Sequence, residues 1–145
     1  MLAIDVGSSS VRAALYDQQG LLAPGSLSQI DVDLTVGAGG VAEIDAERLR
    51  EAVERTIDTT LLHPAARQIG AVGMTTFWHS LVVLDRQGEP MTPVLMWADT
   101  RSEPESLTLR DRLDGHAVHQ RTGCILHPSY LPAKILWLHG DDPGL

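Results

Sequence analysis

The sequence has a single cysteine, Cys124, so it cannot form an internal disulfide bond. A chain without disulfides suits a reducing compartment, and we expect the protein to be cytoplasmic. Positive charge is also scarce, because 11 lysines and arginines stand against 19 acidic residues and the net charge is −8. We therefore expect neither nucleic acid nor an anionic membrane as a partner, since both are bound by basic surfaces.

Long apolar runs are absent as well. No stretch reaches the length of a membrane-spanning helix, and the N-terminus shows no charged segment followed by an apolar one, as a signal peptide would. What is present is the composition of a soluble globular domain: 145 residues, of which 43% are hydrophobic and 21% charged. That length is enough for one domain with a substantial core.

Short apolar runs alternate with helix-forming segments along most of the chain. Strands are expected at residues 2–6, 11–16, 21–30, 68–74, 80–84 and 93–97, the fourth of them buried. A helix is expected from its cap Asp45 to Pro64, with an apolar stripe of Leu49, Val53, Ile57 and Leu61. Further helices are expected at residues 102–113 (capped by Ser102), 115–121 and 130–139, and a glycine-rich loop at 36–40. This order predicts an α/β fold with helices packed on a mixed sheet.

The segment from Leu2 to Asp17 contains the most informative motif. Two strand-like runs are joined by Gly7 and three serines, which predicts a hairpin with a small polar tip. The side chains of Asp5 and the serines could simply satisfy the turn. Alternatively, Gly7 lets the backbone approach an anion, and Ser8 and Ser9 add hydroxyls for phosphate oxygens. Asp5, at the end of a strand expected to be buried, would then hold a hydrated Mg²⁺.

Two strand ends carry a second set of polar and aromatic residues. Trp78 and His79 lie between two predicted strands, and Trp97 to Arg101 follow the next strand. Ligands bind at strand ends of α/β sheets. Trp97 could stack on a sugar, Asp99 could accept bonds from hydroxyls, and Arg101 could pair with Asp99 or contact a carboxylate. The structural alternative is aromatic packing at the sheet edge and a surface salt bridge.

A further polar loop, His127 to Tyr130, precedes the last predicted helix. A helix N-terminus favours an anion, and Ser129 and its neighbours supply hydrogen bonds. An ordinary helix-capping loop would show the same residues.

Four segments, in order and in spacing, resemble the N-terminal domain of the FGGY carbohydrate kinases. They are residues 2–17, 41–49, 73–102 and 122–138, so the resemblance covers nearly the whole chain. It implies an actin-like, ribonuclease H-like mixed sheet, and phosphorylation of a sugar or polyol hydroxyl by MgATP between two domains that close. The phosphates and the metal, which is held through water by Asp5, would lie near Asp5, Gly7, Ser8, Ser9 and Arg12. The sugar would contact Trp78, His79, Trp97, Asp99, Arg101 and Ser129.

The resemblance also suggests a substrate. Glycerol kinases have an Arg-Glu pair where this chain has Trp78 and His79, and xylulose kinases have a Met-His pair. Residues 122–138 are most similar to gluconate kinases, which share the TGC, His-Pro and Lys order. We therefore expect gluconate as the substrate, with xylulose next. His127, Arg101 and Lys134 would suit an acid sugar, and a structural role for Lys134 is equally open.

The family's catalytic aspartate and most of its ATP site lie further along its sequence than these motifs. No residue of this chain matches that aspartate, so no catalytic base is assigned here, and the resemblance implies that it lies beyond Leu145. We expect residues 1–145 to be a partial N-terminal sugar-binding domain, inactive alone, ending in a linker or cut at residues 141–145. An exposed apolar surface could make it a homodimer. The alternative is a non-catalytic actin-like half-domain that binds a sugar or a protein.

Overall fold

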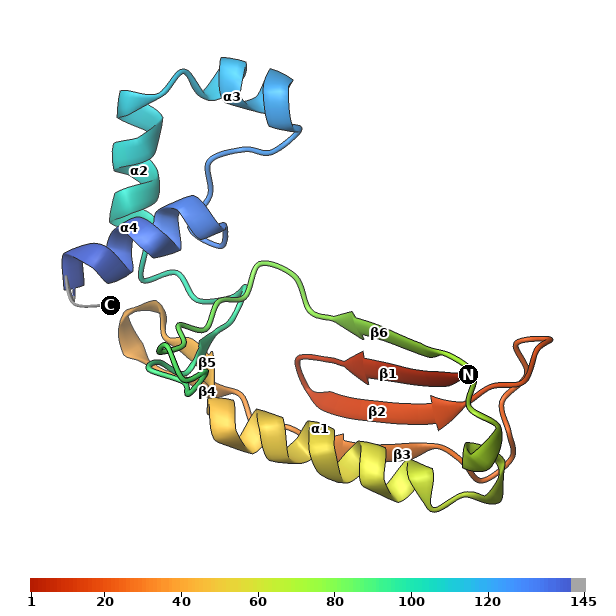
Figure 1. Ribbon diagram of the computed structural model, residues 1–145. Helices are drawn as coiled ribbons and strands as arrows, with labels where there is room; N and C mark the ends of the chain where they lie inside the picture. Colours follow the sequence, from red (N-terminus) through yellow and green to blue (C-terminus); the bar gives the residue numbers. More distant parts are fainter. Residues whose placement is uncertain (142–145) are drawn as a thin grey trace. The chain divides into compact units, whose positions relative to one another are not determined.

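The computed structural model describes residues 1–141. The chain forms two compact units (Figure 1). Unit 1 comprises residues 1–34 and 45–77, and unit 2 comprises residues 35–44 and the chain from residue 78 onward. No helix of the described part is long and apolar enough to cross a membrane.

Two predictions concern the end of the sequence. The linker or cut predicted at residues 141–145 is wrong at its first residue, because Asp141 is the last residue of a helix, and the other four residues lie outside the described residues. Leu145 is among those four, so the catalytic aspartate expected beyond Leu145 also lies outside the described residues and stays a prediction.

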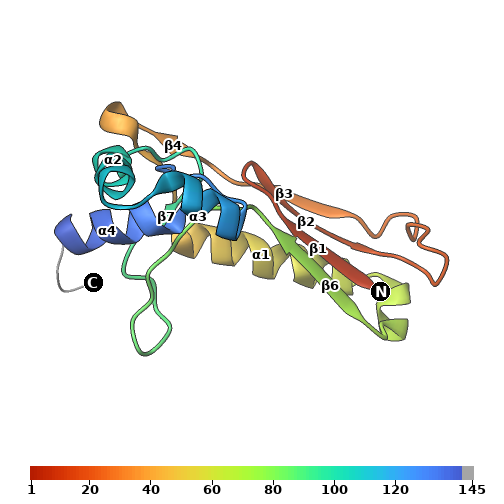
Figure 2. The same cartoon turned by 90° about the horizontal axis from the view of Figure 1, so that it is seen from above.

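Unit 1 is built on a four-stranded mixed sheet with the order β3-β2-β1-β6 (Figure 2). Its strands are β1 (Leu2–Val6), β2 (Ser10–Leu15), β3 (Ser28–Asp31) and β6 (Val72–Thr76). β1 and β2 form the predicted antiparallel hairpin, β3 pairs antiparallel with β2, and β6 runs parallel to β1.

Two of the strands predicted in unit 1 need correction. The third strand starts only at Ser28, because Gly25 (φ +82°) makes a turn in which the Ser26 N–H donates to the Ala23 carbonyl. The strand predicted at 68–74 begins at Val72, because residues 64–68 form a 3-10 helix, η2 (Pro64–Gln68). That strand is also an edge strand with exposed Val72 and Met74, not a buried one, since it pairs on one side only, with β1.

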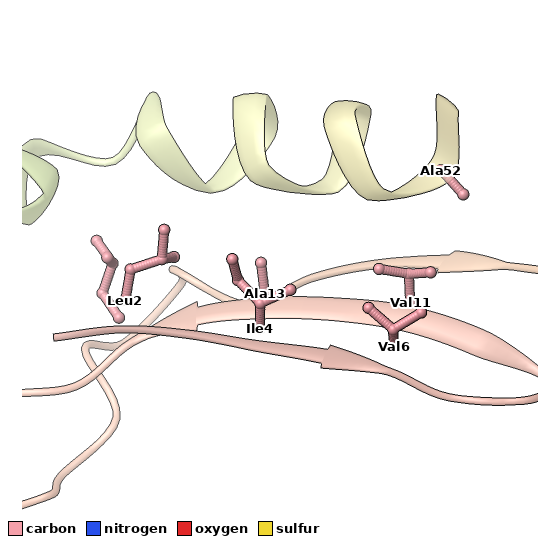
Figure 3. Close-up of a cluster of buried hydrophobic side chains, with 7 residues drawn as sticks. Leu2, Ile4, Val6, Val11, Ala13 and Ala52 are labelled. Carbon is pink, nitrogen blue, oxygen red and sulfur yellow. The ribbon is translucent and has the colours of Figure 1, made fainter. Parts of the chain in front are cut away.

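Helix α1 (Ala46–Leu61) lies along one face of this sheet (Figures 1 and 3). The Asp45 carboxylate accepts a bond from the Arg48 N–H at 2.9 Å, which confirms Asp45 as the N-cap. Alternation in the hairpin places one face of each strand against the helix. The buried cluster consists of Leu2, Ile4, Val6, Val11, Ala13, Leu15 and Ala52.

The predicted apolar stripe of α1 is right at its start and wrong at its end. Leu49, Val53 and Ile57 pack against the core, whereas Leu61 is exposed. A spacing of four residues overshoots one helical turn by about 40°, so the stripe rotates away from the sheet over three steps. Thr60 is buried in its place, and its Oγ1 donates to the Ala13 carbonyl at 3.1 Å.

Within the described residues, unit 2 contains a small sheet with the order β4-β5-β7 and three α-helices. Its strands are β4 (Thr35–Val36), β5 (Ala42–Ile44) and β7 (Val94–Leu95). Its helices are α2 (Glu103–Arg112), α3 (Gly115–Thr122) and α4 (Leu131–Asp141), which confirms the three predicted ones within two residues. The loop predicted at 36–40 contains the end of β4 and a 3-10 turn, η1 (Ala38–Gly40).

Other predictions in unit 2 were wrong. Residues 80–84 form only single bridges, from Leu81 to Leu95 and from Leu84 to Pro90, and β7 has two residues instead of five. Pro90 and Pro93 have no N–H to donate, which limits strand pairing here. Ser102 is the N-cap residue of α2, as predicted, but its side chain makes no capping bond, because its Oγ donates to the Pro128 carbonyl at 2.8 Å.

Candidate functional site

The tip of the β1–β2 hairpin is shaped by Gly7. Its N–H donates to the Ser10 carbonyl at 2.9 Å, and a Cβ built on Gly7 would lie 2.9 Å from that same oxygen. No other residue fits without moving the backbone. The Ser9 carbonyl accepts a bond from the Val32 N–H at 2.9 Å, so the end of β3 holds the other side of the tip. Ser8 and Ser9 lie at a turn that is fixed at both ends.

Asp5 and Arg12 lie opposite one another on β1 and β2. The Arg12 Nη1 donates to the Asp5 Oδ2 at 3.3 Å, and each side chain is 46% exposed. The expectation of a buried Asp5 is therefore wrong, because strand alternation turns Ala3 and Asp5 away from the face that meets α1. The Arg12 Nε donates to the Gln29 Oε1 at 3.0 Å, which orients the guanidinium.

This arrangement fits a hydrated divalent cation. Asp5 offers a carboxylate oxygen that is partly open to solvent at a strand end, and Mg²⁺ is commonly held by one or two carboxylates while it keeps several waters. Among residues 1–141 no three His, Cys, Asp or Glu side chains gather as a metal site. A cation held at Asp5 would therefore be bound largely through water.

Replacing Gly7 by alanine is expected to lower the free energy of unfolding by about 1–3 kcal/mol, because the new Cβ would collide with the Ser10 carbonyl. Gly70→Ala is the matched control, since nothing lies within 4 Å of a Cβ at Gly70. Urea denaturation of both variants measures the difference. Equal stabilities would show that the tip tolerates a side chain.

The second predicted group lies in unit 2 and centres on Asp99, which is only 1% exposed. Its Oδ2 accepts bonds from the Ala42 N–H and the Arg101 Nε, both at 3.0 Å, and its Oδ1 accepts from the Arg101 N–H at 3.1 Å. Burial alone would raise the pKa of Asp99, but the bonds from Arg101 and Ala42 outweigh it and hold that pKa below its ordinary value.

Arg101 is held from three sides. Its Nη2 lies 2.8 Å from the Asp99 Oδ2 and 2.8 Å from the Glu43 Oε2, and its Cζ lies 4.8 Å from the centre of the Trp137 ring. The ion pair is thus mostly buried, and the alternative of a surface salt bridge is wrong. The bonds use Nε and Nη2, so Nη1 is the guanidinium nitrogen with no partner among residues 1–141.

The aromatic and histidine residues of unit 2 differ in exposure and in contacts. Trp78 and Trp97 are 77% and 52% exposed, so both indoles are accessible to a ligand. His79 contacts Tyr130, with ring centres 4.3 Å apart, and Tyr130 contacts His127 at 5.7 Å. These rings border a mostly apolar cavity of about 310 Å³.

The loop before α4 is tied to itself. The Ser129 N–H donates to the His127 Nδ1 at 3.1 Å, and the Tyr130 N–H donates to the His127 carbonyl at 3.0 Å. These bonds favour the capping-loop interpretation of the segment. An anion-binding role for Ser129 stays a prediction.

Sequence reasoning missed two residues of unit 2 that hold the predicted ones. Glu43 lies on the three-residue strand β5, which is too short to show a period, and its bond to Arg101 spans 58 residues. Trp137 was seen only as part of an apolar helix, and no local signal pairs it with Arg101.

The whole chain, residues 1–145, matches the family described as FGGY family of carbohydrate kinases, N-terminal domain. The chain belongs to the FGGY family of carbohydrate kinases. It is 33% identical to a gluconokinase of Bacillus subtilis over 142 residues, 97% of this chain and 27% of the relative. It is 30% identical to a glycerol kinase of Leptothrix cholodnii over 147 residues, 99% of this chain and 29% of the relative.

A solved structure shows the same fold. The crystal structure of Plasmodium falciparum glycerol kinase with ADP superposes with a TM-score of 0.88 at 19% identity, over 98% of this chain and 29% of that one. The α/β fold with a mixed sheet is therefore that of the FGGY kinases, an actin-like fold, which confirms the prediction. The chain spans less than a third of the length of these relatives.

Proposed function

We propose that this chain is the N-terminal, sugar-binding part of a cytoplasmic, ATP-dependent kinase that phosphorylates gluconate. The observation that carries the proposal is the match of all 145 residues to the N-terminal domain of carbohydrate kinases. The similarity to a gluconokinase supports the substrate, although a glycerol kinase is almost as similar. The pair Trp78 and His79 favours a sugar or sugar acid over glycerol.

The hairpin tip has the chemistry that a phosphate site requires. Ser8 and Ser9 supply hydroxyl donors at the tip, and Gly7 shapes the turn that presents them, its own N–H being bonded to the Ser10 carbonyl. Arg12 contributes a positive charge beside Asp5. When bound, Mg²⁺ would neutralise charge on the ATP phosphates, and the Asp5 carboxylate would hold it through water. Support for ATP comes from a family member whose structure contains ADP.

The sugar residues of unit 2 have complementary roles. The exposed Trp97 indole can stack on the carbon face of a sugar. Asp99 has both oxygens occupied by Ala42 and Arg101, so its main contribution would be to hold Arg101. The Nη1 of Arg101 could then donate to the carboxylate of an acid sugar. His79, packed on Tyr130, presents a second polar ring.

The test compares substrates in the natural gene product that carries this chain. ATP consumption is measured with gluconate, xylulose, ribulose and glycerol, and we expect the highest kcat/KM with gluconate. The 145-residue chain alone is expected to give no turnover, because it spans less than a third of its relatives' length and the resemblance implies that the general base lies beyond it. A preference for xylulose or glycerol would overturn the assignment of gluconate as the substrate. No turnover with any sugar, but a thermal shift with one, would support the non-catalytic half-domain instead.

A further inference from the structure

Lys134 is the only lysine in the chain, and it is 1% exposed. Its Nζ, on α4, donates to the carbonyls of His79 at 3.0 Å, of Leu95 at 3.2 Å and of Met96. An ammonium group has three donors and no acceptor. Three carbonyl oxygens therefore occupy its full bonding capacity, which leaves no N–H for a substrate carboxylate.

The three carbonyls belong to the two segments that carry the predicted sugar residues. One comes from His79, the neighbour of Trp78, and two come from the residues directly before Trp97. A single side chain therefore ties both segments to the same helix. The bonds to His79 and Leu95 span 55 and 39 residues.

His79 gives this contact a particular importance. It is the one non-glycine residue with positive φ (59°) in the described part of the chain. That conformation is unfavourable for a residue with a side chain, and it persists where surrounding contacts enforce it. Here Lys134 bonds its carbonyl, and the Tyr130 ring contacts its imidazole.

We propose that Lys134 is a positioning residue that fixes His79 and Trp97 for sugar binding and does not itself contact the sugar. The inference rests on the proposed sugar-kinase function. It decides between the two roles that the sequence left open for Lys134, because the occupied ammonium cannot also pair with an acid sugar.

The charge of Lys134 adds a pH-dependent test. Burial lowers its pKa to about 8, an effect that the Asp99 charge opposes and the Arg101 charge reinforces. The other charged or titratable groups of its surroundings are Glu43, bonded to Arg101, and His79 and Tyr130. Above this pKa the neutral amine has two donors for three carbonyls, so the two segments would loosen and sugar binding would weaken.

The contribution of Lys134 to the free energy of unfolding should rise with pH, whereas the affinity for sugar should fall. Because the folded pKa of Lys134 is below that of the unfolded chain, the unfolded state binds more protons between about pH 8 and 10.5. The contribution of Lys134 to the free energy of unfolding therefore rises with pH over this range. If Lys134 had only a structural role, sugar binding would not weaken over the pH range in which its contribution to the free energy of unfolding rises.

The experiment uses Lys134→Met and Lys134→Arg in the natural gene product, with Arg112→Met on the exposed surface of α2 as the control. For Lys134→Met we expect the KM for gluconate to rise about 10- to 100-fold, with the KM for ATP within about twofold. Lys134→Arg keeps the positive charge and should retain part of the sugar affinity that Lys134→Met loses. The wild-type KM for gluconate should also rise between pH 7 and 9.5, and this dependence should vanish in Lys134→Arg.

The outcomes separate the two claims. Wild-type protein without sugar turnover would overturn the proposed function. Wild-type turnover with an unchanged gluconate KM in Lys134→Met would overturn the role of Lys134 alone. If Lys134→Met fails to fold, the pH profiles of wild type and Lys134→Arg decide, and a wild-type gluconate KM that is flat up to pH 9.5 would overturn the inference.

Discussion

Replacing Asp5 by asparagine is expected to reduce phosphoryl transfer by the natural gene product by on the order of 10²–10³-fold. The substitution keeps the size of the side chain, but it replaces one acceptor oxygen by an NH₂ donor and removes the charge that would hold Mg²⁺. Stability should change by no more than about 1 kcal/mol, because the Asp5–Arg12 pair is half-exposed and such pairs contribute little. The measurements are kcat with saturating sugar and MgATP, and urea denaturation.

Asp58→Asn is the control for Asp5→Asn, since Asp58 is an exposed carboxylate on α1. It should leave kcat unchanged. A higher Mg²⁺ concentration should recover part of the lost rate in Asp5→Asn if the defect is in metal binding. Full activity of Asp5→Asn would show that the hairpin carboxylate is not part of the proposed phosphate site.

Replacing Asp99 by alanine is expected to lower the free energy of unfolding by about 3 to 5 kcal/mol. The change leaves the Ala42 N–H without its acceptor and removes the bonds from Arg101 to Asp99, so that Arg101 keeps only Glu43 as an ion-pair partner. Buried groups that lose their partners carry their full desolvation cost. The KM for sugar should rise in whatever fraction stays folded, because Arg101 and the segment after Trp97 would lose their anchor.

Glu54→Ala is the matched control for Asp99→Ala. Glu54 is also a carboxylate bonded to an arginine, Arg50, at 2.8 Å, but both side chains are 57% exposed. Its removal should change the free energy of unfolding by less than about 1 kcal/mol. Because the folded-state pKa of Asp99 is lowered, its stabilising contribution is fully present above the ordinary carboxyl pKa and is lost as the pH falls from that value through the lower folded-state pKa. Equal losses for Asp99→Ala and Glu54→Ala would show that burial of the pair contributes nothing.

Some elements of the fold can be predicted from the sequence and others cannot. The hairpin, the cap Asp45 and the three helices of unit 2 were predicted correctly, because alternation, capping and helix period depend on residues close together in sequence. Strand length and burial were predicted poorly. β6 proved to be an exposed edge strand, and residues 80–84 form only isolated bridges. Both depend on pairing partners that apolar content does not specify.

The sequence alone determined the class of fold, the polar hairpin tip and the family, since each depends on local motifs in a fixed order. The tertiary structure decided what the single residues do. It showed that Asp5 is half-exposed beside Arg12. It also showed that the Asp99 carboxylate accepts bonds from Ala42 and Arg101, and that the ammonium of Lys134 donates to three carbonyls. The physical reason is distance along the chain: the bonds from Ala42 to Asp99 and from Lys134 to His79 span 57 and 55 residues. No local pattern reports which backbone oxygen a buried charge will meet.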